Sequence, residues 1–396
     1  MRVMVVTESW LPSTNGVVRS VQQVLAHLVD QGADVSLVAP GATQASVPDG
    51  VTHVLATPCV PLARLGYAAS VPTPGLERFV RRHRPDVVHV ASPFLLGAQA
   101  IRAGAELGVP TVAVYQTDVA AFAAAHGFAV ASSSAWRWIV RTHRGATRTL
   151  VCTQDAVRAL RVRGVPRVHH WQRGVDLELF DPARRSHAER RRLAGGRDVP
   201  VVGYLGRLAL EKELHLLEAL AERDDLALAV IGDGPSRELL QQRLPRATFT
   251  GFLGGEDLAR ATASLDVFVH PGRHETLCQG AMQAMAAGVP AVVPAAGGAA
   301  ELVPDAAGRR FTPGSATQLA DAVDAVLRDR DRLGERAREL SQGRSLAASL
   351  RALEQHWAGA VAAHAAQRTA GPTGTAGTAE PSGVPTSRTR RTGAAA

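Results

Sequence analysis

Short apolar runs alternate with amphipathic segments of helical length along most of the chain. In the first half we expect strands at 2–7, 34–40, 86–91, 110–116 and 149–153. Between the first two, valine and leucine recur on one helical face, at Val17, Val21, Val24, Leu25 and Leu28. Alternation of strands and helices is typical of open parallel sheets. The first half therefore predicts a doubly wound α/β domain.

The second half repeats this rhythm, and we expect its strands at 199–206, 226–234, 247–251, 266–271 and 289–295. A polar, arginine-rich stretch at 181–196 lies between the halves and is interpreted as the inter-domain connection. This predicts an N-terminal domain (1–185) and a C-terminal domain (196–342), both with doubly wound parallel sheets. Such sheets bind ligands outside the carboxyl ends of their strands. We therefore expect the two domains to face each other across a cleft that holds the ligand.

The end of the chain divides into two parts. Residues 343–367 read as a helix that we expect to pack back on the N-terminal domain. Residues 368–396 are poor in large apolar side chains and rich in Thr, Gly, Pro and Ala, so we expect a disordered tail.

Composition excludes some classes of protein. Cys59, Cys152 and Cys278 are too few and too scattered for a disulfide framework or a zinc site. No apolar run suits a signal peptide or a membrane span, so we expect a cytoplasmic protein, with peripheral contact at the inner face of the membrane left open. The net charge of +8 permits phosphate, acidic or anionic lipid partners. With 4% aromatic residues and no stacking platform, nucleic acid is not expected as a partner.

Lys212 is the only lysine among 44 lysines and arginines. It lies in "GRLALEKE" after an expected strand, and we expect a helix to begin near Glu211. Arg207 and Lys212 would then lie at a strand's carboxyl end and in a helix's first turn, where cations oppose the helix dipole unless they hold an anion. The alternative is a solvated lysine in a chain whose arginine bias reflects genome composition.

A second motif follows the strand that ends at His270. Its loop carries His274 and Glu275, and we expect a helix over 276–287. Backbone amides at the helix start would form an anion site, at Thr276, Leu277 and Cys278. A carboxylate beside an anion is suited to accept hydrogen bonds from neutral hydroxyl groups, as sugars supply.

Seven segments occur in an order that is specific to one family: "PSTNGVVRSV", "YQTD", "RGVDLELFDP", "GRLALEK", "IGDGP", "HETLCQGAMQAMAAGVPAV" and "GGAAELV". The chain resembles the family 4 retaining glycosyltransferases, and most of all actinobacterial GDP-mannose-dependent α-mannosyltransferases. The resemblance implies the GT-B fold of two facing Rossmann-like domains, in which the N-terminal domain (1–185) binds the acceptor and the C-terminal domain (196–342) binds the nucleotide sugar. It also implies retaining transfer of mannose from GDP-mannose to a lipid-linked acceptor of glycolipid or phosphoinositide type, without a metal or other cofactor.

The resemblance also implies roles for residues. Arg207 and Lys212 would neutralise the donor diphosphate and the charge on the leaving group, while Glu275 would bind sugar hydroxyls. The implied catalytic residues are Arg207, Lys212, Glu275 and Asp118. The implied donor-binding residues are Asn15, Gly16, Gly206, Arg207, Lys212, His274, Glu275, Thr276, Leu277, Cys278 and Gln283.

The chain departs from the family pattern at two positions. Gln283 stands where the family has a second glutamate that accepts hydrogen bonds from the ribose. An amide makes weaker bonds than a carboxylate, so we expect donor binding to be weaker by about 1–2 kcal/mol. Gln116 stands where many relatives have histidine. Asp118 either orients the acceptor or sugar, or caps a turn after the strand.

Several alternatives remain open. A UDP-sugar donor, or a nucleotide-sugar-binding or epimerase protein of the same fold with weak transferase activity, fits the same motifs. A pyridoxal phosphorylase would use Lys212 as its Schiff-base residue. A dehydrogenase lacks its glycine fingerprint, and a glycosidase lacks its carboxylate pair. "DRD" at 329–331 is interpreted as a solvated helix face.

The segment "GLERFVRRHRP" at 75–85 has a basic amphipathic pattern. Leu76, Phe79 and Val80 alternate with arginines, so the segment could rest on anionic lipid. The alternative is a helix packed on the core with a solvated basic face.

Overall fold

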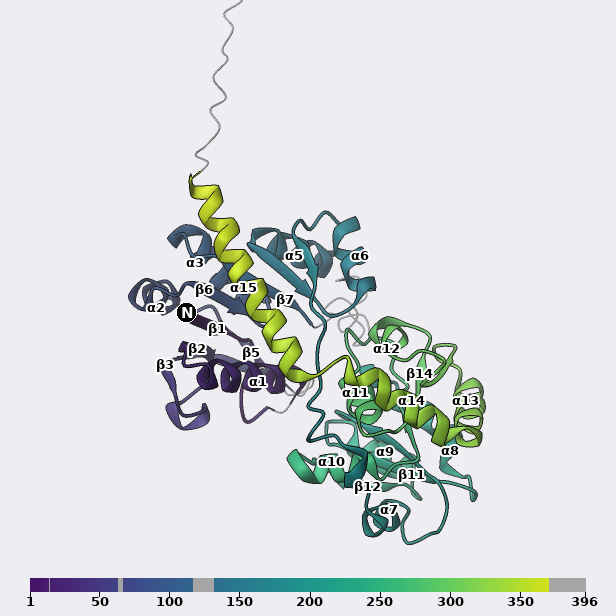
Figure 1. The fold of residues 1–396 in the computed structure, drawn as a ribbon. Helices are drawn as coiled ribbons and strands as arrows, with labels where there is room; N and C mark the ends of the chain where they lie inside the picture. The colour runs from purple at the N-terminus through teal and green to yellow at the C-terminus, as the bar shows by residue number, and fades with distance from the viewer. Residues whose placement is uncertain (14, 63–66, 117–131, 370–396) are drawn as a thin grey trace, which may run out of the picture.

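Two parallel sheets organise the chain, one in each lobe of the molecule (Figure 1). The computed structural model describes residues 1–13, 15–62, 67–116 and 132–369. Asp118 and the expected tail from 370 onward lie outside the described residues. None of the helices in the described part of the chain is both long enough and apolar enough to cross a membrane.

The N-terminal sheet has the strand order β3-β2-β1-β6-β7-β8-β9, with every pairing parallel. Its strands are β1 Arg2–Val6, β2 Asp34–Pro40, β3 Val51–Thr57, β6 Val87–Val90, β7 Thr111–Tyr115, β8 Arg148–Val151 and β9 Val168–His170. The five expected strands are present. The two edge strands, β3 and β9, were missed because edge strands need no continuous apolar run.

Helices cover both faces of this sheet. Asn15 caps α1, and the valines and leucines expected on one face are buried, apart from Val17, which is partly buried. The helices are α1 Gly16–Asp30, α2 Gly75–His83, α3 Leu96–Leu107, α5 Ser132–Gly145 and α6 Gln154–Val162, with a short 3₁₀ turn, η1, at Gln44–Ser46. A separate antiparallel hairpin is formed by β4 Cys59–Leu62 and β5 Tyr67–Ser70.

The C-terminal sheet has the order β12-β11-β10-β13-β14-β15. Its strands are β10 Val201–Leu205, β11 Ala227–Ile231, β12 Thr248–Gly251, β13 Val267–Val269, β14 Ala291–Pro294 and β15 Gly308–Phe311. All but β15 were expected. Its helices and 3₁₀ turns are η4 Pro182–Arg184, α7 His187–Leu193, η5 Leu210–Lys212, η6 Leu214–Leu217, α8 Glu218–Ala221, α9 Arg237–Arg243, α10 Gly255–Ala263, α11 Gln279–Ala286, α12 Gly297–Leu302, α13 Ala316–Arg328 and α14 Arg330–Gln342.

The stretch 181–196 is not the inter-domain connection that its polarity suggested. It forms η4 and α7, which pack on the C-terminal domain. The carboxylate of Asp266, only 1% exposed, binds Arg185 at 2.6 Å and Arg190 at 3.2 Å. Two arginines of the stretch that suggested a connection thus bind a buried carboxylate of the C-terminal domain.

The chain crosses between the domains at two adjacent places. Val175 N donates to Arg344 O at 2.9 Å, and Leu346 N donates to Val175 O at 2.8 Å, so the two crossings pair like strands. A Cβ at Gly174 would overlap the carbonyl oxygen of Ser345. Glycine is therefore required where the two crossings touch.

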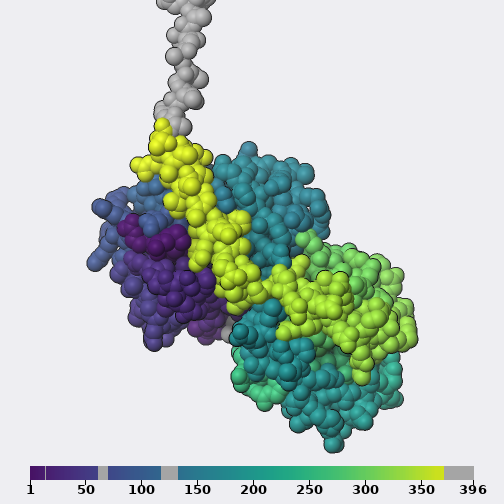
Figure 2. Space-filling model, in the orientation of Figure 1, coloured from purple at the N-terminus to yellow at the C-terminus, as the bar shows by residue number. Residues whose placement is uncertain are grey.

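The last helix, α15 (Leu346–Thr369), returns to the N-terminal domain after α14. It runs across the face of that lobe as the yellow helix in Figures 1 and 2. Leu350, Leu353 and Trp357 are buried in the same core cluster as Val3 and Val5 of β1. The C-terminal helix is thus part of the N-terminal core, although it is 170 residues or more distant in sequence from the strands beneath it.

Candidate active site

A cavity of about 740 Å³ lies between the two domains. Glu8, Ser92 and Gln116 line it from the carboxyl ends of β1, β6 and β7, and Gly206 and Glu275 follow β10 and β13. This is where parallel sheets bind ligands. The cavity lining includes every residue of the donor-binding set named from the sequence.

The loop after β10 carries the two cations singled out in the sequence. The helix expected near Glu211 is wrong: residues 210–217 form two 3₁₀ turns, η5 and η6. Glu213 between them has φ of +50°, and its carboxylate accepts from Arg273 N and Nε at 2.9 Å each. This contact holds the turn and interrupts the helix. Lys212 is therefore not opposed by an α-helix dipole.

Each of the two cations has a carboxylate partner. Arg207 pairs with the buried Glu211, four residues on. Lys212 Nζ donates to Glu275 Oε1 at 2.5 Å, and the two side chains are 20% and 14% exposed. His270 Nε2 lies 3.2 Å from the same Glu275 oxygen. Glu275 is thus the centre of a cluster with a cation on each side.

Electrostatics fix the charge states of this cluster. Burial opposes the charge of Glu275, yet Lys212 and His270 lower the pKa of its carboxyl to about 2. Burial also opposes the charge of Lys212, but Glu275 raises its pKa above the usual value. Although burial lowers the pKa of His270, the adjacent Cys278 and Glu275 raise it to about 10. At neutral pH the cluster therefore contains one carboxylate between two cations.

The loop that follows Glu275 is longer than expected. The helix α11 begins at Gln279 and not at Thr276, with Cys278 as its N-cap residue. Gly298 N donates to Glu275 O at 2.6 Å, and a Cβ at Gly298 would crowd Thr276 O. Because α12 holds this backbone, residues 276–278 precede the helix. The expected helix start at Thr276 is therefore wrong, while all three residues line the cavity.

The N-terminal wall contributes Asn15 and Gly16. Asn15 Oδ1 accepts from Val17 N and Val18 N at 3.0 Å, and its Nδ2 donates to Ser9 Oγ at 2.8 Å. The side chain thus fixes the start of α1. Gln279 Nε2 donates to Gly16 O at 3.4 Å from the other domain.

The loop after β7 contacts both domains. Thr276 Oγ1 donates to Gln116 O at 2.8 Å, and Gln116 Nε2 donates to Ala91 O at 2.6 Å. Gln116 Oε1 accepts from Arg173 Nη1 at 3.1 Å. Arg173 is buried and stacks over Trp171. Gln283 is also buried and lines the same cavity as Arg173.

Comparison with known proteins identifies the family. The family model described as Glycosyltransferase Family 4 matches residues 14–179, and the one described as Glycosyl transferases group 1 matches residues 186–341. A GDP-mannose-dependent alpha-mannosyltransferase of Mycolicibacterium smegmatis is 46% identical over 347 residues, which cover 85% of this chain and 92% of that protein. The chain belongs to glycosyltransferase family 4. The resemblance found in the sequence is confirmed.

One further relative and one solved structure of similar fold extend the picture of this glycosyltransferase. A GDP-mannose-dependent alpha-(1-6)-phosphatidylinositol dimannoside mannosyltransferase of Mycobacterium tuberculosis is 30% identical, covering 88% of this chain and 95% of that protein. The crystal structure of Anabaena Alr3699/HepE in complex with UDP matches with a TM-score of 0.74 and 21% identity, covering 91% of this chain and 100% of that one. This likeness, with the two parallel sheets, confirms the expected GT-B fold.

Sequence reasoning missed several residues of the enzyme's cavity. His270 and Glu211 were read only as a strand end and a helix start, yet they are the partners of Glu275 and Arg207. Arg173 was noticed only as part of a motif. Glu8 follows directly on the first apolar strand, and that position was the available signal. In the described residues, no group of three or more His, Cys, Asp or Glu side chains is placed to hold a metal ion.

Proposed function

We propose that the enzyme transfers mannose from GDP-mannose to a lipid-linked acceptor, with retention of the anomeric configuration. The observation that carries this proposal is the 46% identity to a protein named GDP-mannose-dependent alpha-mannosyltransferase, over 92% of that protein's length. The lipid-linked acceptor is favoured by the relative named as a phosphatidylinositol dimannoside mannosyltransferase. GDP-mannose would bind in the cavity between the domains.

In this proposal Lys212 and Arg207 bind the donor diphosphate. A lysine ammonium has three N–H donors, so its bond to Glu275 leaves two for phosphate oxygens. A guanidinium has five donors and does not lose its charge. As the sugar–phosphate bond breaks, negative charge grows on the leaving diphosphate, and two fixed cations stabilise it. Glu211 and Glu275 hold the cations in position before the donor binds.

Glu275 would contribute to sugar binding through its remaining acceptor capacity. Oε1 is shared by Lys212 and His270, while an ionised carboxylate can accept about four hydrogen bonds in all. Hydroxyls of the mannose would bind at this carboxylate, with His274 and the loop 276–278 around it. Gly16 would bring the backbone of α1 close to the diphosphate from the other wall. Asp118 is proposed to orient the acceptor or the sugar.

The diphosphate needs no divalent ion if two cations neutralise it, so we propose metal-independent turnover. The test is transfer activity after extensive dialysis against EDTA. Activity equal to that of the untreated enzyme is expected. Activity that is lost in EDTA and returns with Mg²⁺ or Mn²⁺ would contradict this part of the proposal.

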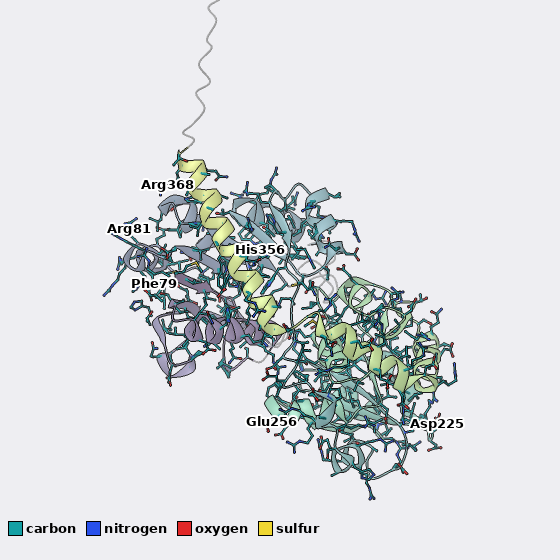
Figure 3. The ribbon with its side chains drawn as sticks, viewed as in Figure 1. Phe79, Arg81, Asp225, Glu256, His356 and Arg368 are labelled. Atoms are coloured by element: carbon teal, nitrogen blue, oxygen red, sulfur yellow. The ribbon has the colours of Figure 1, made fainter. Side chains whose placement is uncertain are left out.

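Peripheral contact with an anionic membrane is proposed through α2. Its apolar residues Leu76 and Val80 are buried, and Phe79 packs against the same core cluster, so they are not available to lipid. The basic residues Arg78, Arg81, Arg82 and Arg84 are exposed, and Arg81 lies at the rim of the N-terminal lobe (Figure 3). The contact would therefore be electrostatic and sensitive to salt.

Co-sedimentation with vesicles tests the membrane contact. Binding to vesicles with 30% phosphatidylglycerol is expected at low salt, and it should fall when Arg78, Arg81 and Arg82 are changed to glutamine. Binding to pure phosphatidylcholine, or binding that is unchanged in the triple variant, would contradict an electrostatic contact through α2.

A panel of nucleotide sugars tests the donor. The melting temperature of the purified enzyme is measured with GDP-mannose, GDP, UDP-glucose and UDP at equal concentrations. A ligand at 100 times its Kd adds about 2.7 kcal/mol to the folded state, so the cognate donor should raise the melting temperature by several degrees. Larger protection by GDP-mannose is expected. Larger protection by the UDP compounds would overturn the proposed donor.

A further inference from the structure

Glu8 lies at the topological switch point of the N-terminal sheet. It follows β1, whose neighbours in the sheet are β2 on one side and β6 on the other. The chain leaves β1 toward β2 and continues from β6 toward β7, so the crevice at their carboxyl ends opens to ligands. Glu8 lines the cavity there, on the wall opposite to the Lys212–Glu275 cluster of the C-terminal domain.

One oxygen of the Glu8 carboxylate, Oε1, already accepts two hydrogen bonds. Oε1 accepts from Gly97 N at 2.8 Å and from Phe94 N at 3.1 Å, at the start of α3. The backbone of Glu8 is also fixed, because its N–H donates to Ser92 Oγ and its carbonyl accepts from Ser70 Oγ. The position of the carboxylate is therefore determined before any ligand binds.

The other oxygen has no partner. Among the residues that the structure describes, none makes a hydrogen bond to Oε2, and Glu8 as a whole is 7% exposed. Burial raises the pKa of Glu8 to about 7, against the opposing effect of the α3 amides. A buried polar atom without a hydrogen bond costs about 1–3 kcal/mol, so the Glu8 carboxylate requires an explanation.

A purely structural role does not account for Oε2. Capping of α3 uses Oε1 alone, and a glutamine at this position would make the same two bonds through its own carbonyl oxygen. A ligand with a hydroxyl or amine donor would complete the second oxygen. A sugar or polyol supplies hydroxyls, whereas a diphosphate would be repelled by the carboxylate.

We propose that Glu8 Oε2 accepts a hydrogen bond from a hydroxyl of the acceptor, whose polyol head group lies over the ends of β1 and β6. This inference rests on the proposed function, because it assigns the acceptor half of the same cavity. Glu8 is a binding residue for the acceptor and does not contact the donor diphosphate. The chemical class of the head group is a neutral polyhydroxylated ring or chain.

The test compares Glu8→Gln with wild type and with Glu106→Gln. Glutamine keeps the bonds to the α3 amides but places an NH₂ donor where Oε2 was. Glu106 is an exposed glutamate on α3 and provides a control for the same substitution outside the cavity. Transfer from GDP-mannose is measured into lipid extracted from Mycolicibacterium smegmatis and dispersed in detergent, with each substrate varied in turn.

We expect Glu8→Gln to raise the apparent KM for the lipid extract by about 10- to 100-fold, with less than a twofold change in the KM for GDP-mannose. Its melting temperature should stay close to that of wild type, and Glu106→Gln should change neither constant. A wild-type acceptor KM in Glu8→Gln would overturn the inference. So would an equal rise in both constants.

A binding measurement separates failure of this inference from failure of the proposed donor. Saturation-transfer NMR with methyl α-D-mannopyranoside, in the presence of saturating GDP, needs no turnover. Wild type should show the signal and Glu8→Gln should lose most of it. A signal that is equal in both proteins, or absent from wild type, contradicts a hydroxyl site at Glu8. If GDP-mannose is not turned over by wild type, the donor proposal is wrong, and this NMR comparison still decides the role of Glu8.

Discussion

Replacing Lys212 by methionine removes a cation from the proposed donor site and also leaves the buried carboxylate of Glu275 without its lysine partner. The pKa of Glu275 is lowered from 4.5 to about 2, because Lys212 and His270 outweigh the effect of burial. This shift in pKa corresponds to about 3 kcal/mol of net stabilisation of the charged carboxylate. Lys212 makes the larger electrostatic contribution. We therefore expect Lys212→Met to lower the free energy of unfolding by about 2–4 kcal/mol and to abolish transfer.

A double variant distinguishes the two effects. Lys212→Met with Glu275→Gln removes both charges of the pair, so its free energy of unfolding should return to within about 1 kcal/mol of wild type. Transfer should remain absent, since the diphosphate has lost a cation. Arg243→Met is the control, because its pair with Glu218 is exposed and should contribute less than about 1 kcal/mol.

Urea unfolding followed by tryptophan fluorescence gives the stabilities, and radiolabelled mannose transfer gives the activities. A double variant that is as unstable as Lys212→Met would refute the electrostatic account of the pair. Transfer near the wild-type rate in either protein would refute the role of Lys212 in the donor site.

Three further changes test other parts of the structure. Gln283→Glu should lower the donor KM by about 5- to 30-fold if the amide weakens ribose binding, and an unchanged or higher KM would exclude this. Glu301 Oε2 accepts a hydrogen bond from Gln154 N of the other domain at 2.8 Å. Glu301→Gln should therefore speed hydrogen exchange of the Gln154 amide several-fold. Unchanged exchange would mean that this contact does not hold the domains together. Gly174→Ala should destabilise the protein by about 1–3 kcal/mol, since its methyl group would overlap Ser345 O, and a wild-type urea midpoint would contradict that overlap.

Acid stability provides a fourth test. The pKa of Glu275 is lower in the folded protein than its value of 4.5 in the unfolded chain. Its contribution to stability is therefore present above pH 4.5 and is lost as the pH falls toward 2. As the pH falls from 4.5 toward 2, the free energy of unfolding should decrease more in wild type than in the double variant Lys212→Met/Glu275→Gln. Equal losses in urea unfolding at pH 5 and pH 3 would contradict a depressed pKa.

The central strands could be predicted because burial on both faces requires continuous apolar runs. The bounds expected for β2, 34–40, are those of the structure, whereas the edge strand β3 mixes exposed and buried residues and gives no such pattern. Leucine spacing in 208–220 resembles that of a helix, but Arg273 holds Glu213 in a left-handed turn. A contact from 60 residues away overrides the local preference.

The residues expected in the donor site all line the cavity, whereas their pairings could not be predicted. Lys212 and Glu275 were singled out separately because each lies in a motif after a strand. Their ion pair joins residues 63 apart in sequence, and no local pattern encodes it. Glu8 binds amides near the start of α3, more than 80 residues away. Only the strand order, which brings β1 beside β6, makes that contact possible.

The most direct test of the account is a crystal structure of the enzyme with GDP-mannose. The account predicts that the diphosphate lies between the domains, with Lys212 Nζ and the Arg207 guanidinium within about 3 Å of phosphate oxygens and Gly16 facing it from the other wall. A diphosphate bound outside this cavity, or one that touches neither cation, would contradict it.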